Sequence, residues 1–513
     1  MPVTRTLLIT SGAYVEPELE AEFGRLPPAF LPIGNRRLFV HQHRLVRDAA
    51  DRILLSLPED FTPDPIDAQL LAELGIEIVP VPAGLSLGQS VVYAMNMTAA
   101  SGPPFRILHG DTLLRGVDLD ADDAISVDRA LPGYRWGQVD PAGEDLVLTG
   151  YFAFADSARL VQEITRAGGG FVAGVLAYAR ARPLRHLVAA QWLDCGHVNT
   201  YHRSRRSLTT EREFNHLAAT GRSVVKSGTN HRKIEAEASW FETLPPPLRI
   251  YTPAFLGRGP GPAPSYALEY LHHPTLADLF VFGRLEPRTW ERILAGCDEF
   301  LSGCAGRPAP PDAPTGPDLY LAKTMERLEA HAQATGLDLD APCRLNGQPL
   351  PSLTEMARQA AALIPDEPAQ TLIHGDFCFS NILYDARADL IRVIDPRGMT
   401  PDGQITPYGD LRYDLGKLHH SAVGWYDLII AGYFRLDRPG PLDFDFTLPA
   451  DPSRQAVAEL FLARDFAGRS VAVAPAISVL LFLSMLPLHR DDPRRQTALL
   501  ANGLRLFAAL DTP

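Results

Sequence analysis

The stretch between Leu7 and Tyr201 alternates short apolar runs with segments in which apolar residues recur every three or four positions. The apolar runs predict strands at residues 7–10, 52–57, 76–81, 105–108 and 146–154. The periodic segments predict helices at residues 38–49, 68–74 and 89–99. Strands and helices that alternate in this way predict an α/β domain with a mostly parallel, doubly wound sheet. Ligands of such sheets bind at the carboxyl ends of the strands.

After Tyr201 the pattern changes. Strand-like and helix-like segments that predict a small mixed lobe lie at residues 223–226, 231–244 and 266–271. A run rich in Gly and Pro at 257–264 predicts a turn between two strands, and a Pro-rich stretch at 307–317 predicts an exposed excursion within a mainly helical region. We expect two domains, at residues 1–203 and 204–513, the second with a small lobe at 204–285 and a large lobe at 286–513.

Composition narrows the class of protein. The chain has 513 residues, which is too long for one core, and its 48 basic and 61 acidic residues give a net charge of −13, which disfavours a nucleic-acid or anionic-lipid surface. Its longest apolar stretch, at 471–486, is interrupted by Pro475 and two serines and predicts a buried helix rather than a membrane span. Five scattered cysteines without a CxxC pair indicate neither a zinc site nor a disulfide framework. The N-terminus lacks a signal-peptide pattern, so we expect a cytoplasmic protein.

A constellation of acidic and amide residues lies late in the chain. An apolar strand leads into His374-Gly375-Asp376, and Asn381 follows five residues after the aspartate. A second apolar strand then ends at Asp395. Phosphoryl transfer needs a base or positioner for the attacking hydroxyl and oxygen ligands for Mg²⁺. We therefore predict that Asp376 is catalytic and that Asn381 and Asp395 bind the metal.

These residues resemble the signature of the aminoglycoside phosphotransferase and choline kinase group, which implies a bilobal protein-kinase-like fold with ATP as substrate. The segment at 408–417 resembles the helix start that follows in that family, where Asp410 and Asp414 have structural or substrate-side roles. An isolated His-Gly-Asp would also suit a tight turn with a capping aspartate, but the complete set favours the kinase. His374 is expected to orient its neighbours rather than to transfer a proton.

The same resemblance assigns two residues of the small lobe. Lys226 lies on the strand and takes the role of the phosphate-contacting lysine, and Glu237 lies on the helix and takes that of its carboxylate partner. The alternative is a surface lysine and half of a solvated ion pair, with Lys233 and Glu235 as competitors for these roles. The segment at 266–271 resembles the hinge that receives adenine.

Three segments of the first domain resemble sugar-phosphate nucleotidyltransferases, which implies a Rossmann-like fold. They are the strand and loop at 7–12, the proline-rich segment at 27–34 and the strand end at 107–112. The element at 191–196 is also similar to that family's Trp-x-Asp-x-Gly. The resemblance implies that Asp111 and Asp194 coordinate a catalytic Mg²⁺, as two carboxylates at separate strand ends suit a hard cation. The alternative is that both cap strand-to-helix turns.

This domain also departs from the family pattern. The family's triphosphate loop uses an arginine and a later Pro-Lys, whereas this chain has Glu16 in the loop and Pro28 after Pro27. A glutamate in place of the arginine would repel the triphosphate instead of attracting it. At an effective dielectric constant near 20, this repulsion amounts to about a few kcal/mol over several ångströms. Nearby arginines that could substitute are Arg25, Arg36 and Arg37.

Two functional hypotheses remain open. In the leading one, a bifunctional cytoplasmic enzyme of surface-glycan (capsule) biosynthesis phosphorylates a small-molecule hydroxyl acceptor with ATP and Mg²⁺ and then transfers a nucleotidyl group, from CTP or another NTP, to the product. In the other, a single-activity kinase carries a degenerate sugar-nucleotide-binding module. The acceptor is not identified by the sequence; candidates to line its pocket are Trp425, Tyr426 and His419. The sequence predicts no nucleic-acid partner and leaves the oligomeric state open.

Overall fold

The computed structural model describes residues 5–100, 104–129, 146–209, 215–219, 222–314, 316, 318–368, 370–449 and 451–510. The chain forms two compact units, Met1–Thr209 and Thr210–Pro513. The division follows α7 (Val198–Thr209), whereas the sequence placed a boundary after Arg203, inside this helix. The last turns of α7 are polar and arginine-rich, so they offer no apolar periodicity from which to read the end of the helix.

Unit 1 is built on a seven-stranded sheet in the order β10-β8-β9-β6-β1-β4-β5. Its strands, in chain order, are β1 (Thr6–Thr10), β4 (Arg52–Pro58), β5 (Ile76–Val81), β6 (Phe105–His109), β8 (Ala124–Arg129), β9 (Leu146–Phe154) and β10 (Arg185–Val188). Among the described strands of this sheet, only β9 runs antiparallel to its neighbours, and β6, β1, β4 and β5 are parallel. The predicted α/β class and the mostly parallel sheet are confirmed.

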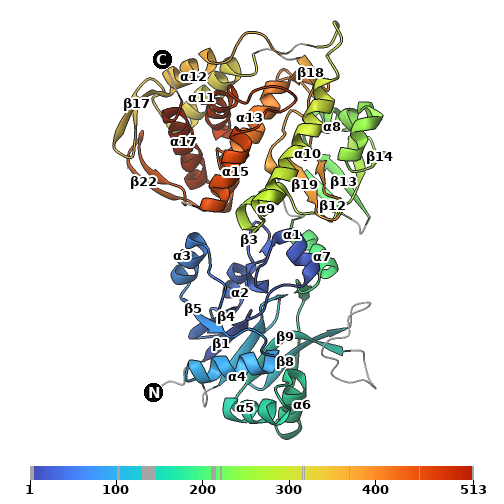
Figure 1. Cartoon of the computed structure of the whole chain (residues 1–513), viewed down its shortest axis with the longest axis vertical. Helices are drawn as coiled ribbons and strands as arrows, with labels where there is room; N and C mark the ends of the chain where they lie inside the picture. The colour runs from blue at the N-terminus through green and yellow to red at the C-terminus, as the bar shows by residue number, and fades with distance from the viewer. Residues whose placement is uncertain are drawn as a thin grey trace. The chain divides into compact units, whose positions relative to one another are not determined.

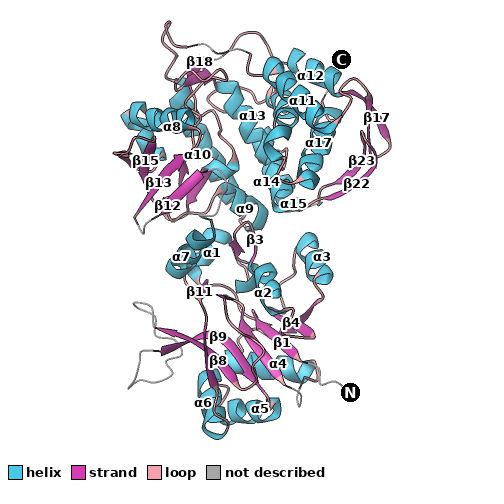
Figure 2. Ribbon diagram, turned by 180° about the vertical axis from the view of Figure 1, so that it is seen from behind, coloured by secondary structure: helices cyan, strands magenta, loops and turns pink. Residues whose placement is uncertain are grey.

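Helices cover this sheet on both sides. They are α1 (Pro17–Phe23), α2 (Leu38–Val46), α3 (Pro65–Glu73), α4 (Leu87–Met97), α5 (Ser157–Arg166), α6 (Phe171–Ala181) and α7. Figures 1 and 2 show α4, α5 and α6 gathered on one side and α2 on the other. Apolar side chains of α4, α5 and α6 pack with Leu8, Leu54 and Ile107 of the central strands in one buried cluster. This burial is what holds the strand ends, and the residues that follow them, in fixed positions.

Two short antiparallel pairs lie beside the sheet of unit 1. They are β2 (Pro32–Ile33) with β3 (Arg36–Arg37), and β7 (Thr112–Arg115) with β11 (Gln191–Asp194). The second pair places Asp194 opposite Thr112, the residue that follows Asp111 in the chain. Two segments far apart in the sequence therefore meet beyond the end of β6.

Unit 2 begins with a four-stranded antiparallel sheet and one helix. The elements are β12 (Asn215–Ala219), β13 (Ser223–Gly228), α8 (His231–Thr243), η2 (Pro246–Tyr251), β14 (Phe255–Arg258) and β15 (Ser265–Glu269), with sheet order β12-β13-β15-β14. Asn230 caps α8 by accepting a hydrogen bond from the Lys233 amide. Ile234, Ala238 and Phe241 form the buried face that packs on the sheet, so Glu237 is carried inward with them.

The rest of unit 2 is mainly helical. Its helices are α9 (Leu276–Phe282), α10 (Pro287–Ala305), α11 (Leu321–Thr335), α12 (Leu353–Ala362), α13 (Leu411–Ala422), α14 (Tyr426–Ala431), α15 (Pro452–Leu462), α16 (Ala474–Ser484), η4 (Leu486–His489) and α17 (Pro493–Ala508). The apolar stretch at 471–486 forms α16, a buried helix, as predicted. Among the described residues no helix is long and apolar enough to cross a membrane.

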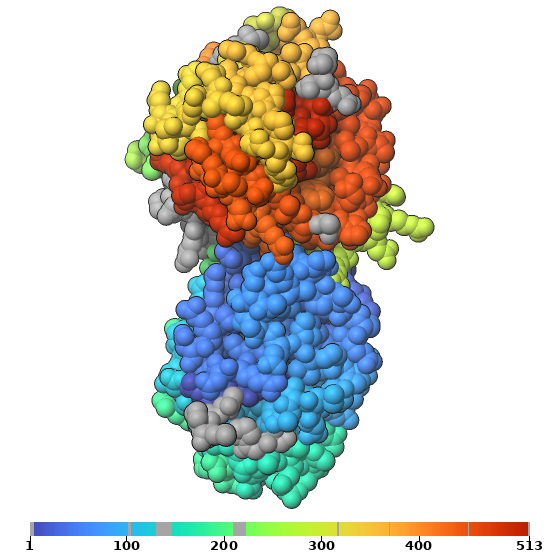
Figure 3. All heavy atoms as spheres, turned by 90° about the vertical axis from the view of Figure 1, so that its left-hand side faces the viewer, coloured from blue at the N-terminus to red at the C-terminus, as the bar shows by residue number. Residues whose placement is uncertain are grey.

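Short strands complete unit 2. They are β16 (Pro342–Leu345), β17 (Gln348–Ser352), β22 (Arg435–Gly440) and β23 (Asp443–Thr447) in one sheet, and the pairs β18 (Gln370–Leu372) with β21 (Tyr408–Asp410) and β19 (Ile382–Asp385) with β20 (Leu390–Val393). In Figure 3 the surface of the sheet formed by β17, β16, β23 and β22 shows yellow and orange residues side by side. The two pairs flank the His-Gly-Asp turn and the residues around Asp395. In the Pro-rich excursion, residues 307–312 are largely exposed, as expected, while Thr315 and Pro317 lie outside the described residues.

Candidate functional site

The His-Gly-Asp turn of unit 2 is tied to the segment around Asp395 by backbone hydrogen bonds. The amide of Arg397 donates to the carbonyl of His374 at 2.8 Å, and the amide of Ile394 donates to that of Asn381 at 2.9 Å. Asn381 itself donates from Nδ2 to the carboxylate of Asp376 at 3.0 Å. The structure therefore brings the three predicted residues Asp376, Asn381 and Asp395 into one site.

Glycine and aspartate supply the unusual backbone angles of this site. Gly375 has φ of +77°, and a Cβ at this position would lie 2.7 Å from the Cβ of Arg397. Asp395 has φ of +57°, in the left-handed region that aspartate tolerates better than most residues. The turn and the end of the second strand can approach closely only with these residue types.

His374 is a buried positioning residue. Its Nε2 lies 3.0 Å from the carbonyl of Ile394, and its Nδ1 accepts from the amide of Asp376 at 3.3 Å. The Nε2–H tautomer satisfies both contacts. Burial lowers the pKa of His374 to about 4, so the ring is neutral at neutral pH. These contacts match the orienting role expected from the sequence.

Lys226 lies between two carboxylates. Its Nζ is 2.7 Å from Oε2 of Glu237 and 2.9 Å from Oδ1 of Asp395. Tyr266 also donates a hydrogen bond to Glu237, at 2.7 Å. The side chains of Lys226 and Glu237 are 5% and 0% exposed, which excludes the alternative of a solvated surface pair. Burial alone would lower the pKa of Lys226, but Asp395 and Glu237 raise it, so the lysine stays charged. Lys233 is a peripheral second partner, 3.6 Å from Glu237.

The carboxylates of Asp376 and Asp395 face solvent. Their side chains are 36% and 46% exposed, although each contacts a lysine. Burial would raise the pKa of Asp376, but Lys417 and Arg397 outweigh it and hold this pKa well below its ordinary value. For Asp395 burial also raises the pKa, and Lys226 lowers it further than burial raises it. Both side chains are therefore ionised and accessible.

The donor set of this site fits a hard divalent cation. Oδ2 of Asp395 and Oδ1 of Asn381 have no hydrogen-bond partner among the described residues, because the lysine binds the other oxygen of Asp395 and the amide nitrogen of Asn381 binds Asp376. Carboxylate and amide oxygens are the ligands that Mg²⁺ prefers. In the described part of the chain no group of three or more His, Cys, Asp or Glu could hold a metal ion by itself. Nucleotide phosphates would supply the remaining ligands.

Two residues that the sequence left without a firm role hold the His-Gly-Asp turn and the start of α13. Asp414, on the first turn of α13, accepts from the amides of His374 and Gly375 at 2.7 and 2.8 Å. Burial raises its pKa to about 7, against the opposing effect of the two amides. Asp410 caps α13 by accepting from the Arg412 amide and pairs with that arginine's side chain at 2.6 Å. Both aspartates are therefore structural.

Four charged or phenolic residues near Asp376 were not predicted. Lys417 on α13 contacts Asp376 at 2.9 Å. One helical turn earlier, the hydroxyl of Tyr413 accepts hydrogen bonds from Arg397 at 2.8 Å and from Lys323 at 3.0 Å. Burial would raise the pKa of Tyr413, but Arg397, Lys323 and Lys417 lower it to about 7. No local pattern links Lys323 on α11 to α13, so the sequence did not reveal this cluster.

The residues suggested for an acceptor pocket lie farther into the helical core. His419 is buried against Phe461, and burial lowers its pKa to about 3. Tyr426 is half-buried and packs on His420, while the guanidinium of Arg505 lies 6.0 Å from the ring centre of Trp425. These contacts describe core packing more than the wall of an open pocket.

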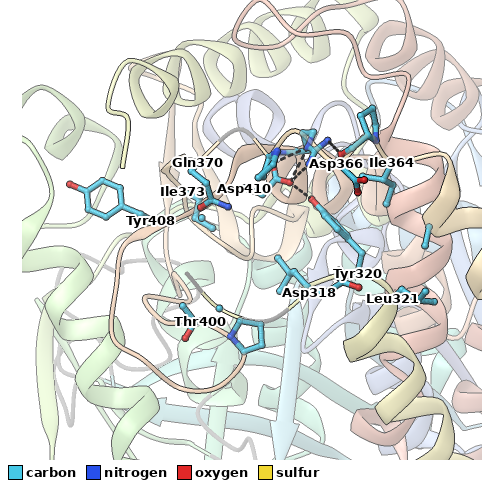
Figure 4. Close-up of a pocket in the computed structure, with 18 of the residues that line it drawn as sticks. Asp318, Tyr320, Leu321, Ile364, Asp366, Gln370, Ile373, Thr400, Tyr408 and Asp410 are labelled. Atoms are coloured by element: carbon cyan, nitrogen blue, oxygen red, sulfur yellow. Dashed lines mark hydrogen bonds and ion pairs between the residues drawn. The ribbon is translucent and has the colours of Figure 1, made fainter. Parts of the chain in front are cut away.

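A cavity of about 580 Å³ borders this site through Arg397 and Ile373. Its walls carry charges of both signs, including Asp318, Arg358 and Asp410. Figure 4 shows Tyr320 reaching to Asp410, to which its hydroxyl donates at 2.8 Å. The sequence gave no sign of this cavity, because its walls come from segments between residues 314 and 412 that share no motif.

In unit 1 the two predicted metal ligands also meet. The amide of Cys195 donates to the carbonyl of Asp111 at 2.7 Å. A Cβ on Gly196 would lie 2.7 Å from the carboxylate of Asp111 and 3.3 Å from that of Asp194, so both carboxylates face this glycine. Burial raises the pKa of both, and for Asp194 the charge of Asp111 adds to the shift. Asp194 Oδ2 is buried without a hydrogen-bond partner in the described structure, which fits a cation between them.

The structure shows the contacts of the residues in unit 1 that differ from the family's triphosphate loop, and of the arginines that could substitute. Glu16 contacts Nδ1 of His197 at 2.8 Å and raises the pKa of this histidine. Arg25 is engaged with Asp60 at 3.0 Å. Arg37 is buried and pairs with Asp67 at 2.6 Å, and Arg36 is exposed on β3. Neither Arg25 nor Arg37 therefore stands as a ready substitute for the family's loop arginine.

Comparisons with known proteins give one family match and several solved structures. Residues 216–446 match the model of a phosphotransferase enzyme family. The chain is similar in structure to aminoglycoside-3'-phosphotransferase of type VIII, with 14% identity, 59% of this chain and 97% of that chain covered, and a TM-score of 0.28. A comparison with curated proteins gives no match.

Two solved structures that the chain resembles are nucleotidyltransferases. They are UDP-glucose pyrophosphorylase complexed with UDP-glucose (12% identity, 41% of this chain and 100% of that chain, TM-score 0.31) and the inositol-1-phosphate CTP transferase from T. maritima (14%, 40% and 96%, 0.31). The family match lies within unit 2, where residues 216–446 fit the phosphotransferase enzyme family.

Proposed function

We propose that unit 2 is an ATP-dependent kinase that phosphorylates a hydroxyl group of a small molecule. The observation that carries this proposal is the convergence of Lys226, Asp376, Asn381 and Asp395 on one site, with two carboxylates open to solvent. In a phosphotransferase-family domain this set supplies a phosphate contact, a base and metal ligands.

Each residue has a role in the proposed reaction. Asp376, ionised and accessible, accepts the proton of the acceptor hydroxyl as its oxygen attacks the γ-phosphorus and the bond to ADP breaks. Asn381 and Asp395 would hold Mg²⁺, which when bound would neutralise charge on the phosphates. Lys226, fixed by the buried Glu237, contacts the nucleotide phosphates. His374 holds the turn in shape through its contact with Ile394.

For unit 1 we propose nucleotidyl transfer to the phosphorylated product. The meeting of Asp111 and Asp194 and the unpaired oxygen of Asp194 favour a metal-dependent reaction. The Glu16–His197 contact favours the alternative, a sugar-nucleotide-binding module without catalysis, because it places a carboxylate where the triphosphate would need a cation. Coupled activity would suit the synthesis of surface-glycan precursors in the cytoplasm.

Asp376→Ala and Asp395→Ala test the kinase. We expect both to abolish ADP release from ATP and Mg²⁺ in a pooled screen of hydroxyl acceptors while the melting temperature stays within a few degrees. Asp340→Ala, which removes an exposed aspartate of the same unit, is the matched control and should retain wild-type turnover. Near-normal phosphoryl transfer by Asp376→Ala or Asp395→Ala would refute the assignment.

Mass spectrometry of the same reactions, with and without CTP, tests unit 1. A nucleotidylated product that disappears in Asp111→Asn supports transfer. Isothermal titration of the full chain with CTP, UTP and GTP, with the ATP site occupied by a non-hydrolysable analogue, separates the two hypotheses. Absence of any further triphosphate binding would leave only the binding module.

A further inference from the structure

Three cations converge beside the proposed catalytic base. Lys323 and Arg397 both donate to the hydroxyl of Tyr413, at 3.0 and 2.8 Å, and both lie near the face of its ring. Arg327, one turn after Lys323 on α11, contacts the carbonyl of Ser484 at 3.1 Å. We call Lys323, Arg327 and Arg397 the basic cluster.

The basic cluster contacts a phenol rather than a carboxylate: burial would raise the pKa of Tyr413, but Arg397, Lys323 and Lys417 lower it to about 7. Within the ranges that the structure describes, none of its three residues forms an ion pair with a carboxylate. The carboxylates that act on Arg397 are already engaged, since Asp376 contacts Lys417 and Asp414 accepts from two backbone amides. Partly buried cations without a carboxylate partner raise the free energy of the folded state. An anionic ligand bound beside them would offset this cost.

The hydroxyl of Tyr413 gives a second, independent sign. It accepts two hydrogen bonds, and its own proton has no acceptor among the described residues. The side chain is 2% exposed. A buried phenol that donates to nothing is incomplete unless a ligand oxygen or a water accepts its proton.

The location of the cluster connects it with the reaction. Tyr413 and Lys417 are four residues apart on α13 and therefore share one face of the helix. Lys417 contacts Asp376 at 2.9 Å, and Arg397 acts on the charge of the same carboxylate. A molecule whose hydroxyl reaches Asp376 from this side would meet the basic cluster with another of its groups.

The use of lysine also distinguishes this site. The sequence has four lysines among its 48 basic residues, namely Lys226, Lys233, Lys323 and Lys417. Lys226, Lys233 and Lys417 contact the acidic groups of the site, and Lys323 contacts Tyr413. In a chain that otherwise uses arginine, lysine occurs where a compact ammonium with three donors is required. Lys323 thus groups with the residues of the reaction centre.

We propose that the acceptor is an anionic hydroxyl compound, a hydroxy acid or a phosphorylated alcohol, whose carboxylate or phosphate binds the basic cluster while its hydroxyl lies at Asp376. This inference rests on the proposed kinase function and narrows its substrate class. Lys323 and Arg397 donate to the anion, and Tyr413 in its protonated form donates its free proton to it.

Anion binding is measured without knowledge of the acceptor. The full chain, saturated with Mg²⁺ and a non-hydrolysable ATP analogue, is titrated calorimetrically with inorganic sulfate. Loss of one charge-assisted contact should weaken sulfate binding in Lys323→Met by roughly tenfold or more, with recovery in Lys323→Arg. Arg288→Met, which removes an exposed cation on α10, should bind as the wild type does. Arg327→Met provides a second test from the cluster.

Equal sulfate binding by wild type, Lys323→Met and Arg327→Met, or none by the wild type, would overturn the proposal. Turnover with ATP is then compared for an acidic panel (glycerate, gluconate, glucose 6-phosphate), a neutral panel (glycerol, glucose) and a cationic panel (choline, ethanolamine, glucosamine). We expect turnover of acidic compounds, with a KM for the acceptor that rises roughly tenfold or more in Lys323→Met and an unchanged KM for ATP. Turnover of neutral or cationic compounds that Lys323→Met leaves unaffected would contradict it.

The results that would refute the kinase function differ from those that would refute anion binding by the basic cluster. If the wild type binds no ATP analogue, or if Asp395→Ala retains turnover, the proposed reaction is wrong. Sulfate titration without the analogue still decides whether the basic cluster binds anions. The two ideas can therefore fail separately.

Discussion

Replacement of Asp414 by alanine tests how the His-Gly-Asp turn is held in place. The Asp414 carboxylate is fully buried and accepts hydrogen bonds from two consecutive backbone amides, those of His374 and Gly375. Alanine leaves both N–H groups in the interior without an acceptor. At about 1–3 kcal/mol for each unsatisfied buried group, the variant should lose about 2–6 kcal/mol of unfolding free energy.

Asp385 offers a matched control. Its carboxylate also accepts from two backbone amides, those of Arg387 and Ala388, but in an exposed turn between β19 and β20. Water can replace the lost acceptor there, so Asp385→Ala should cost about 1 kcal/mol or less. Urea unfolding is followed by tryptophan fluorescence, to which unit 2 contributes Trp240, Trp290 and Trp425 and unit 1 the other two tryptophans, and the change that differs between the variants is assigned to unit 2.

The comparison is made near pH 6, below the pKa of about 7 of Asp414, because above this pKa the buried charge of the wild type would itself cost stability and offset the loss. ATP turnover of Asp414→Ala should fall together with stability, because Asp376 follows directly after the two amides. If Asp414→Ala is as stable and as active as Asp385→Ala, the turn is held by other contacts and the reasoning is wrong.

Three further outcomes are expected. Lys226→Met leaves Glu237 buried without its main cation, and kcat/KM for ATP should fall roughly tenfold to hundredfold in steady-state assays; an unchanged value would remove Lys226 from the phosphate site. The pKa of His419 is lowered by burial to about 3 from an ordinary value of 6.5, so the folded state takes up its proton at lower pH than the unfolded chain does. Stability should therefore be lost as pH falls below 6.5, and in His419→Gln the unfolding free energy should fall less between about pH 7 and about pH 5; an equal fall would contradict this. Gly398 has φ of +63° and a Cβ there would lie 2.2 Å from the carbonyl oxygen of Ala236, so Gly398→Ala should lose about 1–3 kcal/mol by calorimetry together with turnover, and a neutral result would refute the close packing.

Local patterns carried the prediction of the fold and of the residues that meet at the His-Gly-Asp turn. The apolar runs that became β1, β4, β5, β6 and β9 are continuous in sequence, so periodicity alone reveals them. Asp376 and Asn381 lie within one turn and its following residues, and Asp395 ends the next strand pair, so short spacing indicates that they meet. The strand β8, which pairs with β9 and β10, was missed.

The basic cluster shows what spacing cannot reveal. Lys323 lies on α11, Arg397 follows β20 and Tyr413 lies on α13, and only the packing of these elements brings the three together. No residue near Lys323 in the sequence indicates its partner. The rarity of lysine was the one signal available in the sequence, and it gains meaning only when the positions of all four are known.

The helix α16 has a consequence for shortened forms of the protein. The family match ends at residue 446, yet α16 and α17 form the core behind α13, where a Cβ on Gly416 would lie 2.2 Å from Ile477. A fragment cut at the end of the recognisable domain would strip the apolar backing from the helix that carries Asp414 and Lys417. Such a fragment would keep every signature residue of a kinase and lose the scaffold that aligns them, so expression trials should retain the chain through α17.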